Sequence, residues 1–387
     1  MKLMLTTERI PIKLWLDDIE PDALIQARNL ANLPFAFRHI PLMPDCHQGY
    51  GMPIGAILAT KEVVVPNAVG VDIGCGMCAM RTSVRDLGTS DLKKVLSAAR
   101  KTIPLGNKSH QEAQDEACMP KGHETLNIVG RQYTKALKQI GTLGGGNHFI
   151  EIQKGSDGYV WLMVHSGSRN LGYQVATWYN DIAVALNKRY YSVVSAEIDL
   201  AFLPLDTQEA QDYIKEMNYA IAFAFANRKL MMKRMFEALQ SVTGASKHGK
   251  IINKPHNFAA WEDHFGKRVL VHRKGATRAF EDELGMIPGS QGSNSYIVRG
   301  LGNPESFKSC SHGAGRRMGR KQAQRELDLE AEIAMLDQKG VVHAIRHRSD
   351  LDEAPSSYKD IDVVMENQKD LVDIVVELAP MAVLKGT

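Results

Sequence analysis

The chain has 387 residues, of which 44% are hydrophobic, so it can bury one large core or two smaller ones. Its net charge of +3 permits a nucleic-acid partner without requiring one. The opening MKLMLTTERIPIKLW has no apolar leader, the five cysteines are an odd number, and no apolar run approaches the ~20 residues of a membrane span. We therefore expect a cytoplasmic protein outside the membrane, and the lack of repeats or linkers predicts one domain over 1–387.

Hydrophobic patterning predicts short strands mixed with longer helices. We expect helices over 21–32, 90–103, 171–191 and 206–240, and one more that continues to about 337 after the arginines at 316–325. We expect strands over 54–59, 62–66, 161–165 and 269–271. The methionine and aromatic stripe of 206–240 is best explained as core packing.

The segment VGVDIGCGM at 69–77 is the most distinctive part of the chain. Its glycines permit a tight bend that carries Asp72 and Cys75, and a carboxylate with a thiolate makes a metal site plausible. On this segment alone, a glycine turn with a buried cysteine is an equal alternative. The Cys75–Cys78 spacing lacks the context of a redox motif.

Histidines recur at similar turns along the chain. His148 follows a run of three glycines, His165 ends an apolar strand, and His256 follows a proline. With Asp72 and Cys75 they form a ligand set suited to a divalent transition metal, including manganese. By contrast, we interpret His110, Cys118 and His123 as scattered surface residues of a polar segment, 107–123. Asp45 and His47 are expected in a loop that precedes the strand at 54–59.

Two further segments suggest phosphate chemistry. PGSQGSNSY at 288–296 could cradle a phosphate with backbone N–H groups, although a hairpin loop is an equal alternative. SHGAGR at 311–316 places one histidine, His312, in a glycine-rich turn. Neither GxxxxGK[ST] nor KxDG occurs, so a covalently held nucleotide would need a nucleophile such as a histidine ring nitrogen.

Together these motifs resemble those of the RtcB family, the RNA ligases that act on 3′-phosphate ends with GTP and manganese. The resemblance runs almost from end to end and in the family's order. Its motifs are MPDCHQGYG (43–51), VGVDIGCGM (69–77), GTLGGGNHF (141–149), VHSGSRNLG (164–172), HN (256–257), RKGATRA (273–279), PGSQGSNSY (288–296), SHGAGR (311–316) and LKG (384–386).

The resemblance implies a role for each matching residue. His312 matches the histidine that becomes guanylated, and Cys75 matches a ligand that bridges two Mn²⁺ ions. The implied metal ligands are Asp72, Cys75, His148, His165 and His256. The implied guanylate-binding residues are Asn147, His256, Asn257, Pro288, Gly289, Ser290, Ser293, His312, Gly313, Ala314, Gly315 and Lys385. Asp45 and Arg169 lie in matching motifs without an assigned role, whereas Cys46 and Gly319 depart from residues common in the family.

The family also implies a fold and an activity. The fold is a single α+β domain with packed sheets flanked by helices. The activity joins RNA ends with a 3′-phosphate or 2′,3′-cyclic phosphate to 5′-hydroxyl ends, as in tRNA splicing and RNA repair, by a monomer. The rival interpretations are a metal-dependent RNA cyclic phosphodiesterase and a non-catalytic RNA-binding protein. The tail at 384–386 would ordinarily be disordered, but the apolar run before it and the resemblance favour an anchored Lys385.

Overall fold

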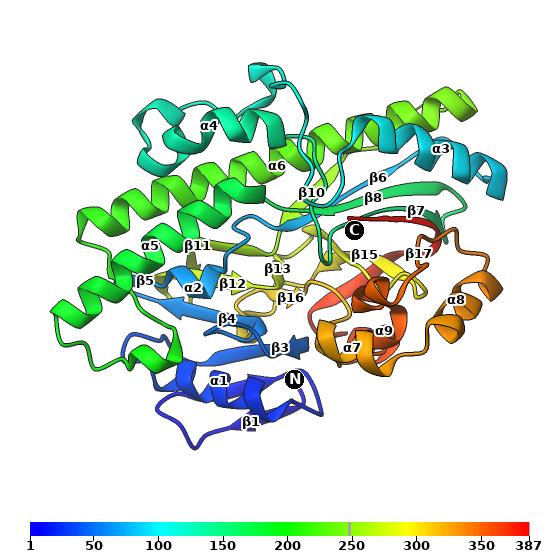
Figure 1. Ribbon diagram of the computed structural model, residues 1–387. Helices are drawn as coiled ribbons and strands as arrows, with labels where there is room; N and C mark the ends of the chain where they lie inside the picture. The colour runs from blue at the N-terminus through cyan, green and yellow to red at the C-terminus, as the bar shows by residue number, and fades with distance from the viewer. Residues whose placement is uncertain (247–248, 387) are drawn as a thin grey trace.

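The computed structural model describes residues 1–246 and 249–386. It has two large sheets with helices outside them, the α+β architecture that the family resemblance predicts (Figure 1). Apolar side chains of both sheets pack into a shared cluster, in which Ile57 and Val271 of one sheet join Val298 and Val372 of the other.

The first sheet has six strands in the order β1-β2-β3-β4-β12-β11. Their bounds are β1 Leu3–Leu5, β2 Ile12–Leu14, β3 Ile40–His47, β4 Ile54–Thr60, β12 Lys267–Lys274 and β11 Asn257–His264. All eight residues of β3 are buried. The expectation that Asp45 and His47 lie in a loop is therefore wrong, because the strand continues through both despite Pro41 and Pro44.

The second sheet has seven strands in the order β10-β6-β8-β7-β17-β15-β14. Their bounds are β10 Ile252–Pro255, β6 Gly76–Arg81, β8 Val160–Ser166, β7 Phe149–Gly155, β17 Val372–Lys385, β15 Ser295–Gly300 and β14 Leu284–Ile287. Strand β17 is paired on both sides, with β15 and with β7. Lys385 pairs with Phe149, so the tail is anchored and the alternative of a disordered tail is wrong.

Two small ribbons complete the strands: β13 Ala276–Arg278 pairs with β16 Ser309–Ser311, and β5 Val63–Val64 with β9 Leu203–Pro204. The expected strand at 62–66 is thus only two residues long, because Pro66 begins a helix. The helices are α1 Pro21–Asn32, α2 Pro66–Val69, α3 Thr89–Thr102, α4 Asn127–Gln139, α5 Arg169–Arg189, α6 Gln208–Thr243, α7 Arg320–Glu326, α8 Leu329–Gln338 and α9 Ile361–Glu366.

Two helical expectations have different outcomes. The single helix expected up to 337 is wrong, because Leu327 is extended and the Asp328 side chain caps a new helix, α8, by accepting from the Ala331 N–H. The long helix α6 is confirmed, and its buried methionines pack in the core. Even α6 contains no apolar stretch long enough to cross a bilayer, nor does any other helix of the described residues.

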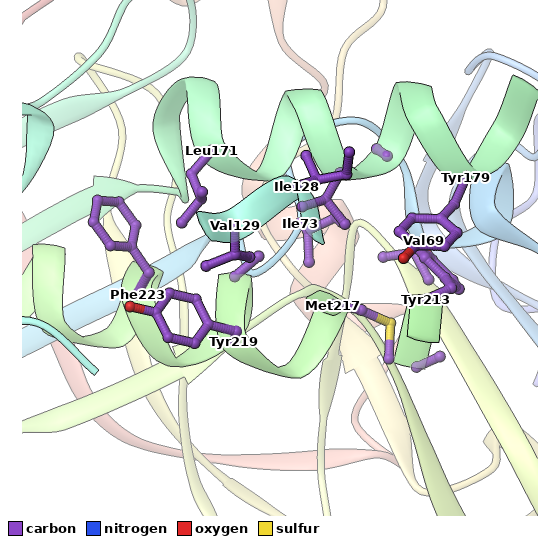
Figure 2. Close-up of a cluster of buried hydrophobic side chains, with 14 of the residues drawn as sticks. Val69, Ile73, Ile128, Val129, Leu171, Tyr179, Tyr213, Met217, Tyr219 and Phe223 are labelled. Atoms are coloured by element: carbon purple, nitrogen blue, oxygen red, sulfur yellow. The ribbon is translucent and has the colours of Figure 1, made fainter. Parts of the chain in front are cut away.

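Helices α4, α5 and α6 lie together on one side of the molecule and enclose a hydrophobic cluster (Figures 1 and 2). Figure 2 shows Val69 and Ile73, which flank the Asp72 bend, inserted among Leu171 of α5 and Met217 of α6. Both side chains are fully buried. Burying each is worth roughly 1.5–3 kcal/mol, so the core holds the bend at both ends.

Candidate metal centre and nucleotide pocket

Three buried side chains from separate elements meet at one point. Cys75 precedes β6, His148 precedes β7 and His165 lies near the end of β8, and β8 is hydrogen-bonded to both other strands. The Cys75 Sγ is 3.4 Å from the His148 Nε2 and 3.3 Å from the His165 Nε2. One potential ligand atom from each residue lies within 4.8 Å of the others, so this cluster could bind a metal ion.

Backbone hydrogen bonds fix the bend that presents Asp72 and Cys75. The Cys75 N–H donates to the Asp72 carbonyl, and the Gly74 N–H donates to the Asn257 carbonyl. Gly70 and Gly74 have φ values of 92° and 74°, in the left-handed region that favours glycine. The glycines therefore allow the tight geometry that the sequence predicted for this segment.

The histidine rings are oriented by their Nδ1 atoms. The Nδ1 of His148 lies 3.0 Å from the Leu143 carbonyl, and that of His165 lies 3.1 Å from the Asn147 carbonyl. Because a carbonyl only accepts, Nδ1 carries the proton in each neutral ring, and the Nε2 lone pair points at Cys75. Backbone partners of this kind orient many metal-binding histidines.

Asp72 and His256 extend the cluster. The Asp72 Oδ2 is 3.0 Å from the His148 Nε2, and the His256 Nε2 is 3.4 Å from the His165 Nε2. The buried His256 Nδ1 has no hydrogen-bond partner within 1–246 and 249–386. All five predicted ligands are thus brought together, and their nitrogen, sulfur and oxygen atoms form a donor set that could share a cation.

Burial sets the protonation of the cluster. It holds the pKa of His165 and His256 well below the usual value, with help from neighbouring imidazoles, so both rings are neutral and can act as ligands. Burial and the nearby Asp72 carboxylate raise the pKa of the Cys75 thiol. A bound metal would need the thiolate, so binding would release a proton.

His312 stands beside this cluster, with its ring 4.7 Å from that of His256. Its Nδ1 lies 2.6 Å from the Asp45 Oδ2, and the backbone N–H groups of His312 and Gly313 donate to the same oxygen. Burial alone would raise the pKa of Asp45, but its contacts with His312 outweigh burial and lower it. An ionised Asp45 keeps the proton on Nδ1, which leaves the Nε2 lone pair free as a nucleophile.

Close backbone packing brings the His312 turn against β3. A Cβ atom on Gly315, whose φ is 75°, would lie 2.3 Å from the Asp45 carbonyl oxygen. Only glycine fits both this space and this conformation. The SHGAGR segment therefore needs Gly315 so that Asp45 can reach His312.

A small pocket lies at the end of β17. Its lining includes the predicted residues Gly289, Ser290 and Lys385, together with Glu151 and Glu353. The Lys385 ammonium is 5.8 Å from the Phe149 ring centroid, and that ring lies 5.5 Å from the His165 ring. The pocket thus adjoins the Cys75, His148 and His165 cluster through Phe149.

The other predicted residues occupy nearby positions. Pro288 packs against Gly313, and the Ser293 hydroxyl is 2.9 Å from that of Ser290. Asn257 donates to the Asp72 carbonyl and accepts from the Gly275 N–H, so it links the bend at 69–77 to the turn at Gly275. Asn147 orients His165 through its carbonyl, Ala314 is buried beside Gly315, and Arg169 donates to the Gly106 carbonyl.

Sequence reasoning missed several polar residues of the pocket: Glu151, Glu353 and Tyr358. It also gave Asp45 no role. The segment DEAPSSYK at 352–359 combines charge with a proline turn, but nothing in its spacing links it to Lys385. For Asp45, the signal was an acidic residue inside an otherwise apolar strand.

The fold and site are those of an α+β protein with a candidate metal centre. The sequence matches the family described as tRNA-splicing ligase RtcB over residues 26–127 and 108–386, and the chain belongs to this family. It is 39% identical over 412 residues to the RNA-splicing ligase RtcB of Escherichia coli K12, covering 99% of each chain. It is 32% identical over 459 residues to the tRNA-splicing ligase RtcB of Thermococcus kodakarensis, covering 98% of this chain and 95% of that protein.

Proposed function

We propose that this protein is an RNA ligase that uses GTP and two Mn²⁺ ions to join 3′-phosphate or 2′,3′-cyclic phosphate ends to 5′-hydroxyl ends. The observation that carries this proposal is the pairing of His312 with Asp45 beside the Cys75 cluster. A hydrolase needs no such nucleophile, because water can attack a cyclic phosphate at a metal site. The ligase is therefore favoured over the phosphodiesterase and over a non-catalytic RNA-binding protein.

His312 is the nucleophile in this proposal. Its Nε2 attacks the α-phosphorus of GTP, a P–N bond forms, and pyrophosphate leaves. Asp45 keeps the proton on Nδ1 and stabilises the positive charge that develops on the ring. A 2′,3′-cyclic phosphate is first hydrolysed by water to a 3′-phosphate. An oxygen of the 3′-phosphate then attacks the guanylate phosphorus and breaks its P–N bond to His312. The 5′-hydroxyl of the second RNA attacks the 3′-phosphorus, a phosphodiester forms, and GMP leaves.

Asp72, Cys75, His148, His165 and His256 would hold the metal ions. Bound Mn²⁺ would neutralise phosphate charge and align the reacting groups. The fit rests on the donor set, in which the Nε2 atoms of His148 and His165 converge on the Cys75 sulfur, which becomes a thiolate ligand once its proton is released.

The residues of the pocket at the end of β17 would hold the guanylate. The pocket has a volume of only about 20 Å³ in this structure, so its side chains would have to move apart to admit the base. Guanine presents two adjacent donors, N1–H and the 2-amino group, which suit a carboxylate, whereas adenine does not present that pair. Glu151 supplies a buried carboxyl group, with Lys385 and Ser290 in the same lining. The match between the Glu151 carboxyl group and the two guanine donors supports GTP rather than ATP as the nucleotide.

The remaining parts of the proposal concern the whole chain. We propose one ligase domain over 1–387 that acts as a monomer in the cytoplasm. The five unpaired cysteines support a reducing compartment. RNA would be held by lysine and arginine side chains, so its binding should weaken as salt increases.

The test is a labelling experiment. The protein is incubated with Mn²⁺ and GTP labelled at the α-phosphate, and acid-labile label on the protein is measured. Label that transfers to RNA carrying a 3′-phosphate supports the ligase. Opening of cyclic phosphate without label, and without any need for GTP, would favour the phosphodiesterase.

A further inference from the structure

A single buried carboxylate gathers the basic side chains of the pocket. The Glu353 side chain is 2% exposed and ends the short 3₁₀ helix Arg348–Glu353. Its Oε1 accepts from the Arg320 Nε at 2.8 Å, and its Oε2 lies 3.1 Å from the Arg316 Nη1. The Lys385 Nζ is 3.9 Å from the same Oε2. Glu353 is thus the common partner of three cations.

The charges in this cluster do not balance. The three cations face the ionised Glu353, and two other acidic groups lie close to them, Asp352 and Glu151. Burial raises the pKa of Glu151 to about 8, so at neutral pH that group is mostly protonated and adds little negative charge. The Tyr358 hydroxyl donates to the Glu353 Oε2 and adds no charge. The pocket therefore keeps a surplus of positive charge, which suits an anionic ligand such as a nucleotide.

Lys385 has few other ways to hold its position. It is the last residue of β17, its side chain is 10% exposed, and its ammonium is 5.8 Å from the centroid of the Phe149 ring. A lysine carries a flexible four-carbon stem, so it needs a partner to point in one direction. The carboxylate of Glu353 supplies that direction.

We propose that Glu353 is a positioning residue that holds the Lys385 ammonium in the place where it meets the bound nucleotide. Glu353 itself need not touch the ligand, because its oxygens already accept from Arg320 and Tyr358 and lie within ion-pair distance of Arg316. This inference rests on the proposed function, since it deepens the role of Lys385 in GTP recognition. A nucleoside triphosphate is the ligand class concerned.

A first experiment needs no nucleotide. Glu353 favours the charged form of Lys385, whereas burial lowers the pKa of that lysine. In Glu353→Gln the Lys385 amine should be neutral more often. Brief acetylation at pH 8 should therefore modify Lys385 severalfold faster than in the wild type, as measured by mass spectrometry. The matched control is Glu332→Gln, a buried carboxylate that accepts from the Ser356 N–H rather than facing Lys385. An unchanged Lys385 rate in Glu353→Gln would overturn the proposal.

A second experiment separates positioning from general stability. With α-labelled GTP, Glu353→Gln should raise the KM for adduct formation about tenfold, with the rate at saturating GTP within about twofold of the wild type. If Glu353 acts through Lys385, the double variant Glu353→Gln, Lys385→Ala should have a KM within about twofold of that of Lys385→Ala alone. The full tenfold effect in both backgrounds would show an independent role and overturn the proposal.

Two provisions keep the tests decisive. If Glu353→Gln does not fold, Glu353→Asp takes its place, and withdrawing the carboxylate by one methylene should still give a KM increase that disappears in the Lys385→Ala background. No adduct in the wild type would overturn the proposed function, while the acetylation experiment would still decide whether Glu353 controls Lys385.

Discussion

Two clusters of buried polar side chains can be compared directly. In one, Glu262 accepts two hydrogen bonds from Arg273 and faces His264 at 2.8 Å. In the other, Cys75, His148 and His165 converge with sulfur and nitrogen lone pairs toward one another. Both clusters lie on sheet strands or at their ends, and both are removed from solvent.

The difference lies in how donors match acceptors. Arg273 supplies donors to Glu262, the Ser309 hydroxyl and the Phe307 carbonyl, and this pairing lowers the pKa of Glu262 to about 2 despite its burial. The Cys75 cluster has no comparable donor at its centre among the described residues. A satisfied cluster has no lone pairs left for a ligand, whereas a cluster of converging imidazole and sulfur atoms offers them to a cation.

The largest expected effect comes from removing the sulfur of the Cys75 cluster. Cys75→Ala should lose nearly all bound manganese and abolish both guanylation and ligation. Even outer partners of metal ligands cost about 10–100-fold in affinity, so losing a ligand should cost roughly 100-fold or more. Metal analysis of the folded variant measures this, with the equally buried Cys78→Ala as the control. Full metal occupancy with normal activity would remove Cys75 from the metal centre.

An equally complete loss of adduct, with metal retained, is expected for His312→Ala. This variant should fold and bind Mn²⁺, because the ring lies beside the cluster rather than within it. It should still join RNA that already carries a 3′-terminal guanylate, since that substrate bypasses the histidine. Peptide mapping by mass spectrometry decides, and an adduct on any other residue would exclude His312.

A substitution in the Glu262–Arg273 cluster should lower stability and leave metal content and guanylation unchanged. Glu262→Gln leaves Arg273 buried without its counter-charge, which should cost about 3–5 kcal/mol of stability. Metal content and guanylation of the folded fraction should stay near the wild-type level. Denaturant unfolding combined with metal analysis measures both quantities. Loss of metal without loss of stability would contradict the distinction between the two clusters.

How far the sequence could predict this site depends on how local each signal is. The bend at 69–77 follows from its glycines, and the helix over 21–32 begins with Pro21 as expected. The pairing of β17 between β7 and β15 joins residues far apart in the chain, and no local pattern encodes it. Glu353 was missed for the same reason, because its partners are at 316, 320 and 385.

Lys385→Ala tests a residue that shares a feature with each cluster. Lys385 has a charged partner, as Arg273 has, and it is also proposed to bind a ligand, as the Cys75 cluster is. The proposed charge-assisted contact between Lys385 and the nucleotide would be worth about 1.5–3 kcal/mol, so guanylation should weaken roughly tenfold or more. Thermal stability and metal content should change little, because β17 remains paired. Adduct formation is measured across GTP concentrations. Equal rates at every concentration would remove Lys385 from the site.

The smallest expected effect is a pH dependence set by Glu151, a buried carboxyl group that is only partly satisfied. Burial raises its pKa to about 8, although a hydrogen bond from Gln153 and the charge of Lys385 oppose the shift. Below pH 8 the group is mostly protonated and is a poorer acceptor for the two guanine donors. Affinity for GTP should therefore rise by up to about tenfold between pH 7 and pH 9, because one pKa unit corresponds to a factor of ten.

Calorimetry in the presence of a chelator would isolate this effect from the titration of the metal ligands. ATP serves as the matched ligand, since it carries the same phosphates without the paired guanine donors. Its binding should vary little over the same pH range, and Glu151→Gln should flatten the dependence for GTP. The same slope for both nucleotides would mean that the phosphates titrate rather than Glu151. A steeper slope for GTP alone would make Glu151 the group that selects guanine. Glu151 would then differ from both clusters, because its carboxyl group would change its protonation to bind a ligand.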